Sequence, residues 1–117
     1  MSAYLNDPRL DSVTSREGRA ARDYLIDWTG SRGWKLQCGG TVVPHIQFRR
    51  SAIERPYPHS LILNPLTPTF YIRKPTKAEL QYVPKVYDGA HANRRGEVKI
   101  PVPDKRTAER IATDFLT

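Results

Sequence analysis

The hydrophobic pattern of the first third of the chain predicts a helix. Thr14 and Glu17 form a Thr-x-x-Glu capping box, in which each side chain can accept a hydrogen bond from a backbone N–H at the helix start. Ile26 falls on the polar side, with Arg19 and Arg22, and is therefore expected to be exposed. The apolar side of this helix consists of Ala20, Ala21, Tyr24, Leu25 and Trp28, and the helix ends at Gly30 and Gly33.

From Trp34 the apolar spacing changes from helical to alternating, which predicts a β-hairpin. Leu36 and Cys38 precede a turn at Gly39-Gly40, and Val42, Ile46 and Phe48 follow with the same two-residue spacing. A three-residue loop over 39–41 places both apolar sets on one face, whereas a two-residue loop does not. Pro44 marks an edge or a bulge because it cannot donate to the ladder. The opposite face then carries Lys35, Gln37, His45, Gln47 and Arg49.

Two strands, a helix, a strand and a helix are expected after a proline-stiffened loop over residues 50–59. The strands cover 60–63, 69–73 and 98–102, and the middle one directs Tyr71 and Arg73 outward. Thr76 and Glu79 form a second capping box, which starts a short helix that Pro84 ends or kinks. The last helix is capped by Asp104 and buries Ala108, Ile111, Ala112 and Phe115.

These elements predict an α+β fold. We expect a mainly antiparallel sheet of about five short strands, with the N-terminal and C-terminal helices packed on one face. Residues 1–13 are expected to form an N-terminal arm and residues 14–117 a single α+β domain. Nine of the ten prolines lie between residues 44 and 103, which keeps the strands short and protects their edges. The second face of the sheet is left to solvent or to a partner.

Composition points to an anionic partner. The 117 residues carry a formal charge of +7, from 19 Lys plus Arg against 12 Asp plus Glu, with 13 Arg to 6 Lys. The charge is shared between the two halves of the chain, so it is not a basic tail. The planar guanidinium binds phosphate or carboxylate with two hydrogen bonds, which favours a polyanion or an acidic protein surface as partner. The alternative is that the source genome is rich in G and C and therefore favours Arg codons, in which case most of these side chains are simply solvated.

Several classes of protein and site are not expected. No stretch of about 18 apolar residues exists, and polar residues interrupt the first ten positions, so we expect neither a membrane span nor a signal peptide. A cytoplasmic protein is therefore expected. Cys38 is the single cysteine, so an internal disulfide and a structural zinc site are not expected. His45, His59 and His91 lack the spacing and acidic neighbours of a metal centre, so no cofactor is expected.

No residue pair predicts nucleophilic catalysis. His59 and Ser60 are neighbours at the end of the predicted loop and the start of the next strand, and in a strand they would point to opposite faces. Cys38 and His45 also fall on opposite faces of the hairpin in the preferred register. We therefore expect no catalytic residues of this kind.

One pattern allows a different reading. Asp88 followed by Glu97 and Lys99 fits the loose Asp…Glu-x-Lys arrangement by which some nucleases hold Mg²⁺ and position the attacking water. Glu97 and Lys99 also fit the solvent side of a half-buried strand. A Mg²⁺-dependent nuclease is therefore kept as an alternative.

Basic residues gather in groups at strand ends, in loops and at a helix start. In an antiparallel sheet, the outward residues of the predicted hairpin and of the strand over 69–73 share one surface, which mixes cations, amides and an aromatic ring. These residues include Lys35, His45, Arg49, Tyr71 and Arg73. Such a surface suits nucleic acid, because cations neutralise phosphates and a ring stacks on bases. Such a surface could equally bind an acidic protein surface. The remaining alternative is an ordinary solvated face of the sheet that binds no partner. The groups are Arg49-Arg50 with Arg55, Arg73-Lys74 with Lys77, Arg94-Arg95 with Lys99, and Lys105-Arg106.

The sequence therefore predicts a non-enzymatic binding protein. Its partner is expected to be nucleic acid or a nucleic-acid-processing complex. A first alternative is a small inhibitor or adaptor of the kind carried by phages and mobile elements, which contacts protein through a loop with Tyr57 at its tip. The residues expected to bind the partner are Lys35, His45, Arg49, Arg50, Tyr71, Arg73, Lys74, Arg94, Arg95, Lys105 and Arg106.

Overall fold

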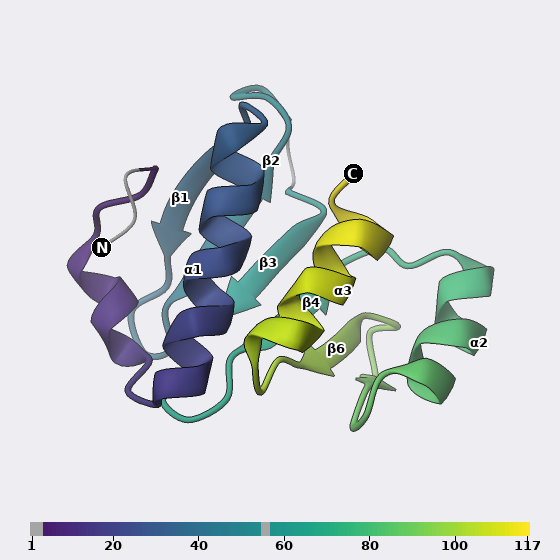
Figure 1. Cartoon of the computed structure of the whole chain (residues 1–117). Helices are drawn as coiled ribbons and strands as arrows, with labels where there is room; N and C mark the ends of the chain where they lie inside the picture. The colour runs from purple at the N-terminus through teal and green to yellow at the C-terminus, as the bar shows by residue number, and fades with distance from the viewer. Residues whose placement is uncertain (1–3, 55–56) are drawn as a thin grey trace.

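The computed structural model describes residues 4–54 and 57–117, and within them the chain forms three α-helices and one six-stranded antiparallel sheet (Figure 1). The strands lie in the order β1-β2-β3-β4-β6-β5. This is the predicted α+β fold with one additional short strand, β5. The elements are a short 3₁₀-helix η1 (Pro8–Ser12), followed by α1 (Arg16–Ser31), β1 (Lys35–Gly39), β2 (His45–Arg49), β3 (His59–Ile62), β4 (Thr69–Ile72), α2 (Lys77–Val86), β5 (His91–Ala92), β6 (Val98–Pro101) and α3 (Lys105–Phe115).

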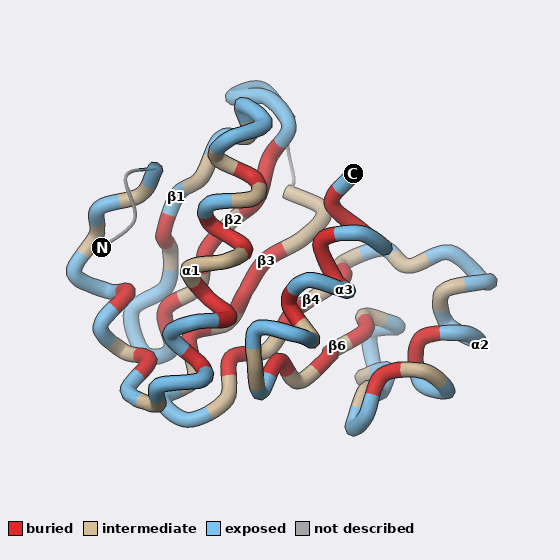
Figure 2. The backbone as a smooth tube through the Cα atoms, in the orientation of Figure 1, coloured by how far each residue is buried: buried red, intermediate tan, exposed pale blue. Residues whose placement is uncertain are grey.

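The helices and the sheet form two layers. The N-terminal helix α1 and the C-terminal helix α3 pack side by side on one face of the sheet, as predicted, while α2 lies beside the β5–β6 edge (Figure 1). Figure 2 shows the buried residues concentrated between the two layers. The strands contribute alternate residues to this core, including Cys38, Ile46, Phe48, Leu61, Phe70, Ile72, Val98 and Ile100.

The β1–β2 hairpin has the predicted faces but a longer loop. Cys38 pairs with Ile46 and Leu36 with Phe48, so the loop spans residues 40–44 and the prediction of a three-residue loop was wrong. The alternating pattern places Val42 in the second strand, but Val42 is 93% exposed and lies in the loop. The register differs from the predicted one by an even number of residues, so every side chain keeps its predicted face.

Helix α1 begins one residue later than predicted. The N-cap is Ser15, whose Oγ accepts a hydrogen bond from the Gly18 N–H at 3.0 Å. Thr14 instead donates its hydroxyl to the Pro65 carbonyl at 3.2 Å and ties the helix start to the β3–β4 loop. The predicted cap at Thr14 was therefore wrong, because a contact distant in sequence engages that side chain.

The buried side of α1 also differs from the prediction. Ile26 is fully buried and Arg22 is only 7% exposed. For Arg22 the cause is η1, which carries the buried Leu10. The Arg22 guanidinium donates to the Leu10 carbonyl at 2.6 Å. A helix covered by both the sheet and a neighbouring segment buries a wider arc than the pattern of apolar residues indicates.

Helices α2 and α3 begin where the sequence predicts. Thr76 accepts from the Glu79 N–H at 3.1 Å, and the Glu79 carboxylate accepts from the Thr76 N–H at 2.8 Å, completing the capping box. Pro84 lies inside α2, which continues past it to Val86. Asp104 caps α3 by accepting from the Thr107 N–H at 2.9 Å. The predicted apolar side of α3, namely Ala108, Ile111, Ala112 and Phe115, is buried.

Candidate binding site on the open sheet face

The face of the sheet opposite α1 and α3 carries mostly polar side chains, because residues alternate along each strand. The strand register aligns Gln47 with Ser60, Ser60 with Tyr71, and Tyr71 with Lys99. These four residues form a row across β2, β3, β4 and β6. We call this side of the sheet the open face.

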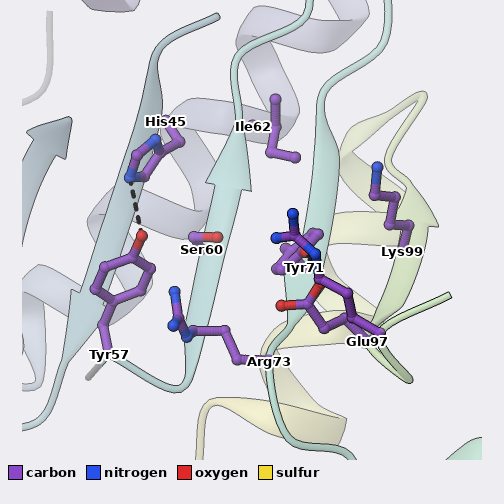
Figure 3. Close-up of a pocket in the computed structure, with 9 residues that line it drawn as sticks. His45, Tyr57, Ser60, Ile62, Tyr71, Arg73, Glu97 and Lys99 are labelled. Carbon is purple, nitrogen blue, oxygen red and sulfur yellow. Dashed lines mark hydrogen bonds between the residues drawn. The ribbon is translucent and has the colours of Figure 1, made fainter. Parts of the chain in front are cut away.

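The open face contains a hollow of about 330 Å³ (Figure 3). In the close-up, the labelled side chains stand in front of the strands, with helices visible behind them. Elements far apart in sequence therefore meet in one site. The hollow is lined by His45, Tyr57, Ser60, Ile62, Tyr71, Arg73, Arg95, Glu97 and Lys99.

Tyr57 forms one side of the hollow. It comes from the proline-rich loop between β2 and β3 and folds back over the sheet, with its hydroxyl 3.2 Å from His45 Nε2 (Figure 3). The guanidinium carbons of Arg49 and Arg73 lie 5.6 Å and 5.0 Å from the centre of its ring. Two cations, one on β2 and one directly after β4, therefore flank one aromatic ring, within the range of cation–π attraction.

A chain of hydrogen bonds fixes the protonation state of His45. Arg49, only 8% exposed, donates to the Gln47 side-chain oxygen at 2.7 Å. The Gln47 amide nitrogen therefore faces His45 Nε2, at 3.2 Å, and donates to it. His45 is thus neutral, with its proton on Nδ1. Burial, followed by the charges of Arg9 and Arg73, lowers the pKa of His45 and favours the same state.

Glu97 forms the other side of the hollow. Its Oε1 accepts hydrogen bonds from the Tyr71 hydroxyl and, at 2.9 Å, from the Asn93 side-chain amide. These two bonds, followed by the charges of Arg95 and Arg73, lower the pKa of Glu97, so the carboxylate is ionised. Burial and the bond to Glu97 raise the pKa of Tyr71, which stays protonated as the donor.

Three cations on the hollow form no ion pair with another described residue. Arg73, Arg95 and Lys99 line it together with a single carboxylate, that of Glu97. Lys99 places its ammonium 5.8 Å from the centre of the Tyr71 ring. None of the three takes part in an ion pair in the described part of the chain, where the pairs are Arg9–Asp7, Arg22–Asp23 and Arg110–Asp114. The hollow therefore has an excess of positive charge.

The open face brings together about half of the residues that the sequence predicted to bind a partner. Arg49 lies beneath Tyr57, and Lys35 is exposed on the edge strand β1, directly opposite Arg49. The predicted residues on this face are Lys35, His45, Arg49, Tyr71, Arg73 and Arg95. The outward residues of β1, β2 and β4 therefore share one face of the sheet, and their role in binding stays a prediction.

The other predicted binding residues do not line the hollow. Arg50 donates to the Thr117 carbonyl at 3.1 Å and lies over Trp34. Lys105 and Arg106 lie on the first turn of α3, on the helical side of the molecule. Lys74 is exposed after β4, and Arg94 is exposed in the β5–β6 turn beside Arg95. Arg55 lies outside the described residues.

The three residues of the nuclease pattern are not assembled. Glu97 pairs across the β5–β6 hairpin with Asn93, whose N–H donates to the Glu97 carbonyl at 2.8 Å. Asp88 precedes Gly89, which lies against Pro101 at the opposite end of the same hairpin. Among residues 4–54 and 57–117, no group of three or more His, Cys, Asp or Glu side chains is placed to hold a metal ion. The geometry therefore gives this alternative no support.

Sequence reasoning gave Tyr57 and Glu97 different roles from those the structure suggests. Tyr57 was assigned to an outward loop, but it lies across the sheet. A signal for Glu97 was present in Asn93-Arg94-Arg95-Gly96, a turn sequence between two short strands that places Asn93 beside Glu97. Gly96 has the positive φ of 76° that such a turn requires.

Comparisons with protein families, curated proteins and solved structures find no match for this chain. Across the described residues, no helix is both long enough and apolar enough to cross a membrane.

Proposed function

We propose that the protein binds single-stranded nucleic acid on the open face without acting on it chemically. The observation that carries this proposal is the convergence of Arg73, Arg95 and Lys99 on one hollow beside two tyrosines, with no ion pair to neutralise them within the described residues. Unneutralised cations on one face attract a polyanion and release its counterions when it binds.

The shape of the site favours a single strand over a duplex. Duplex DNA is read in its major groove by a protruding helix or a two-stranded ribbon. The open face instead presents a hollow lined by Tyr57 and Tyr71, with the hydroxyl of Ser60 between them in the sheet. Unpaired bases can enter such a hollow and stack on aromatic side chains while the backbone follows the cations. The single cysteine, Cys38, fits a reducing cytoplasm as the compartment of this function.

Salt dependence of binding tests the proposal. Fluorescence anisotropy is measured with labelled single-stranded RNA, single-stranded DNA and duplex DNA, from about 50 mM salt upward. We expect the single strands to bind more tightly than the duplex. Each cation–phosphate contact contributes about 0.7 to the slope of log affinity against log salt for a single strand. Arg73→Gln and Arg95→Gln should therefore each reduce the slope by about that amount.

Arg106→Gln is the matched control, since it removes the same charge from an exposed position on α3. It should leave the slope unchanged. The proposal fails if no nucleic acid binds at about 50 mM salt, where electrostatic attraction is strong, or if the control lowers the slope as much as Arg73→Gln does. A partner protein retained from nuclease-treated lysate, in the absence of nucleic-acid binding, would favour the adaptor alternative.

A further inference from the structure

Glu97 is the exception on a face suited to phosphates. A carboxylate next to Arg73, Arg95 and Lys99 weakens the potential that draws a polyanion into the hollow. The described residues nevertheless hold it ionised. Both of its hydrogen bonds, from Tyr71 and Asn93, reach Oε1. In the described part of the chain Oε2 accepts none, so this oxygen is available to a ligand.

The position of this carboxylate is fixed before any ligand binds. The Asn93 side-chain oxygen accepts from the backbone N–H groups of Arg95 and Glu97, at 2.9 Å and 3.0 Å. The same side chain then donates its amide to Glu97. The turn, the amide and the Tyr71 hydroxyl therefore hold the carboxylate against the hollow, and a ligand need not pay for ordering it.

This inference rests on the proposed function: we propose that Glu97 is a specificity-determining residue that selects guanine in the bound strand, through the N1–H and the 2-amino group of the base. An ionised carboxylate accepts hydrogen bonds only and repels the phosphate backbone. In a bound nucleic acid, Glu97 therefore accepts hydrogen bonds from donors on the edge of a base, while Arg73 and Lys99 contact the phosphates.

The four bases differ in what they offer to such an oxygen. Guanine presents two neighbouring donors, N1–H and the 2-amino group. The amino groups of adenine and cytosine each stand beside a ring nitrogen that is an acceptor, and the donor of uracil stands between two carbonyl oxygens. Those acceptors repel a carboxylate. Hydrogen bonds to a charged group contribute about 1.5–3 kcal/mol, which corresponds to at least about tenfold in affinity.

The first experiment uses the unmodified protein. Oligouridines of about eight nucleotides, each with U, A, C or G at the central position, are compared by fluorescence anisotropy. We expect the guanosine oligomer to bind about tenfold more tightly than the all-uridine oligomer. Inosine, which lacks the 2-amino group, should lose most of this advantage. The 7-deaza form of guanosine, altered on the opposite edge of the base, should retain it.

The second experiment removes the charge with Glu97→Gln. The ratio of guanosine to uridine affinity should fall to about one, while affinity for the all-uridine oligomer rises, because repulsion of phosphates is lost. A merely structural role for Glu97 would lower both affinities together. Glu109→Gln, the same change at an exposed position on α3, should preserve the guanosine preference.

The outcomes separate the two proposals. Binding of the all-uridine and guanosine oligomers with equal affinity, or no loss on replacing guanosine by inosine, overturns the inference and leaves the proposed function standing. Failure of every oligomer to bind overturns both. Thermal unfolding followed by circular dichroism shows whether Glu97→Gln folds, and if it does not, the inosine measurement still decides.

Discussion

His59 shows how one position on a strand determines the chemistry of a side chain. It faces the core, while its neighbour Ser60 faces the hollow, as the sequence predicted for adjacent strand residues. Its ring stacks on Phe70 at 5.4 Å between centres and lies 6.3 Å from Phe115. Nδ1 is buried and has no hydrogen-bond partner among the described residues. Burial lowers the pKa of His59 to about 4, so the ring is neutral at pH 7.

His59 should make stability depend on pH. The unfolded state takes up a proton near pH 6.5, whereas the folded state resists protonation until about pH 4. Stability is therefore lost as pH falls through this window, by about 3 kcal/mol. Urea unfolding at pH 7, 5.5 and 4 measures the loss. His59→Phe, which keeps an aromatic ring, should flatten this part of the profile, and His91→Gln at an exposed position should not. Equal profiles for His59→Phe and the parent would contradict the assignment.

At the scale of elements, alternation was predictable and packing between segments was not. The β1–β2 loop was misjudged because Val42 fits an alternating pattern although it lies in a loop, yet the even displacement preserved both faces of the hairpin. Arg22 was misplaced because nothing in the sequence indicates that its guanidinium reaches the Leu10 carbonyl in η1, and Ile26 because the buried arc of α1 is wider than the pattern of apolar residues indicates. The candidate site was found in part, since its cations and Tyr71 follow strand parity, whereas Tyr57 depends on how a long loop folds back.

The helix caps should differ in their effect on the whole fold. Asp104 caps α3, which packs against α1 and buries several side chains, so Asp104→Ala should lower the free energy of unfolding by about 1 kcal/mol. Thr76→Ala removes the cap of α2, which has Val83 as its buried residue. This second change should loosen α2 with little effect on global unfolding. Urea unfolding measures the first effect and hydrogen exchange of α2 amides the second. Equal global losses would show that α2 and α3 unfold as one unit.

At the scale of the whole molecule, the sheet separates stability from binding. Phe70 is fully buried and contacts the rings of Phe48, His59 and Phe115. The next residue, Tyr71, faces the opposite side and lines the hollow. Two adjacent aromatic residues therefore serve different layers, and substituting them should have different consequences.

Phe70→Ala should lower the free energy of unfolding by about 3–5 kcal/mol, because it leaves a cavity in the core. Tyr71→Ala should cost markedly less stability while weakening nucleic-acid binding. Thiol labelling of Cys38 measures the difference. The thiol is buried, and burial raises the pKa of Cys38 to about 11, so it reacts slowly in the folded protein. The labelling rate at pH 8 therefore reports how often the core opens. Labelling should accelerate in Phe70→Ala far more than in Tyr71→Ala. Similar labelling rates in the two variants would contradict the separation of layers.

The even spacing that assigns alternate residues to the two sides also makes the fold a scaffold for diversification. Changes at positions such as Gln37, Gln47 and Ser60 leave the helical layer and its contacts in place. Random libraries at these positions should therefore yield a large fraction of folded members with altered ligand preference. Descendants of such a sheet could diverge in recognition while retaining one architecture.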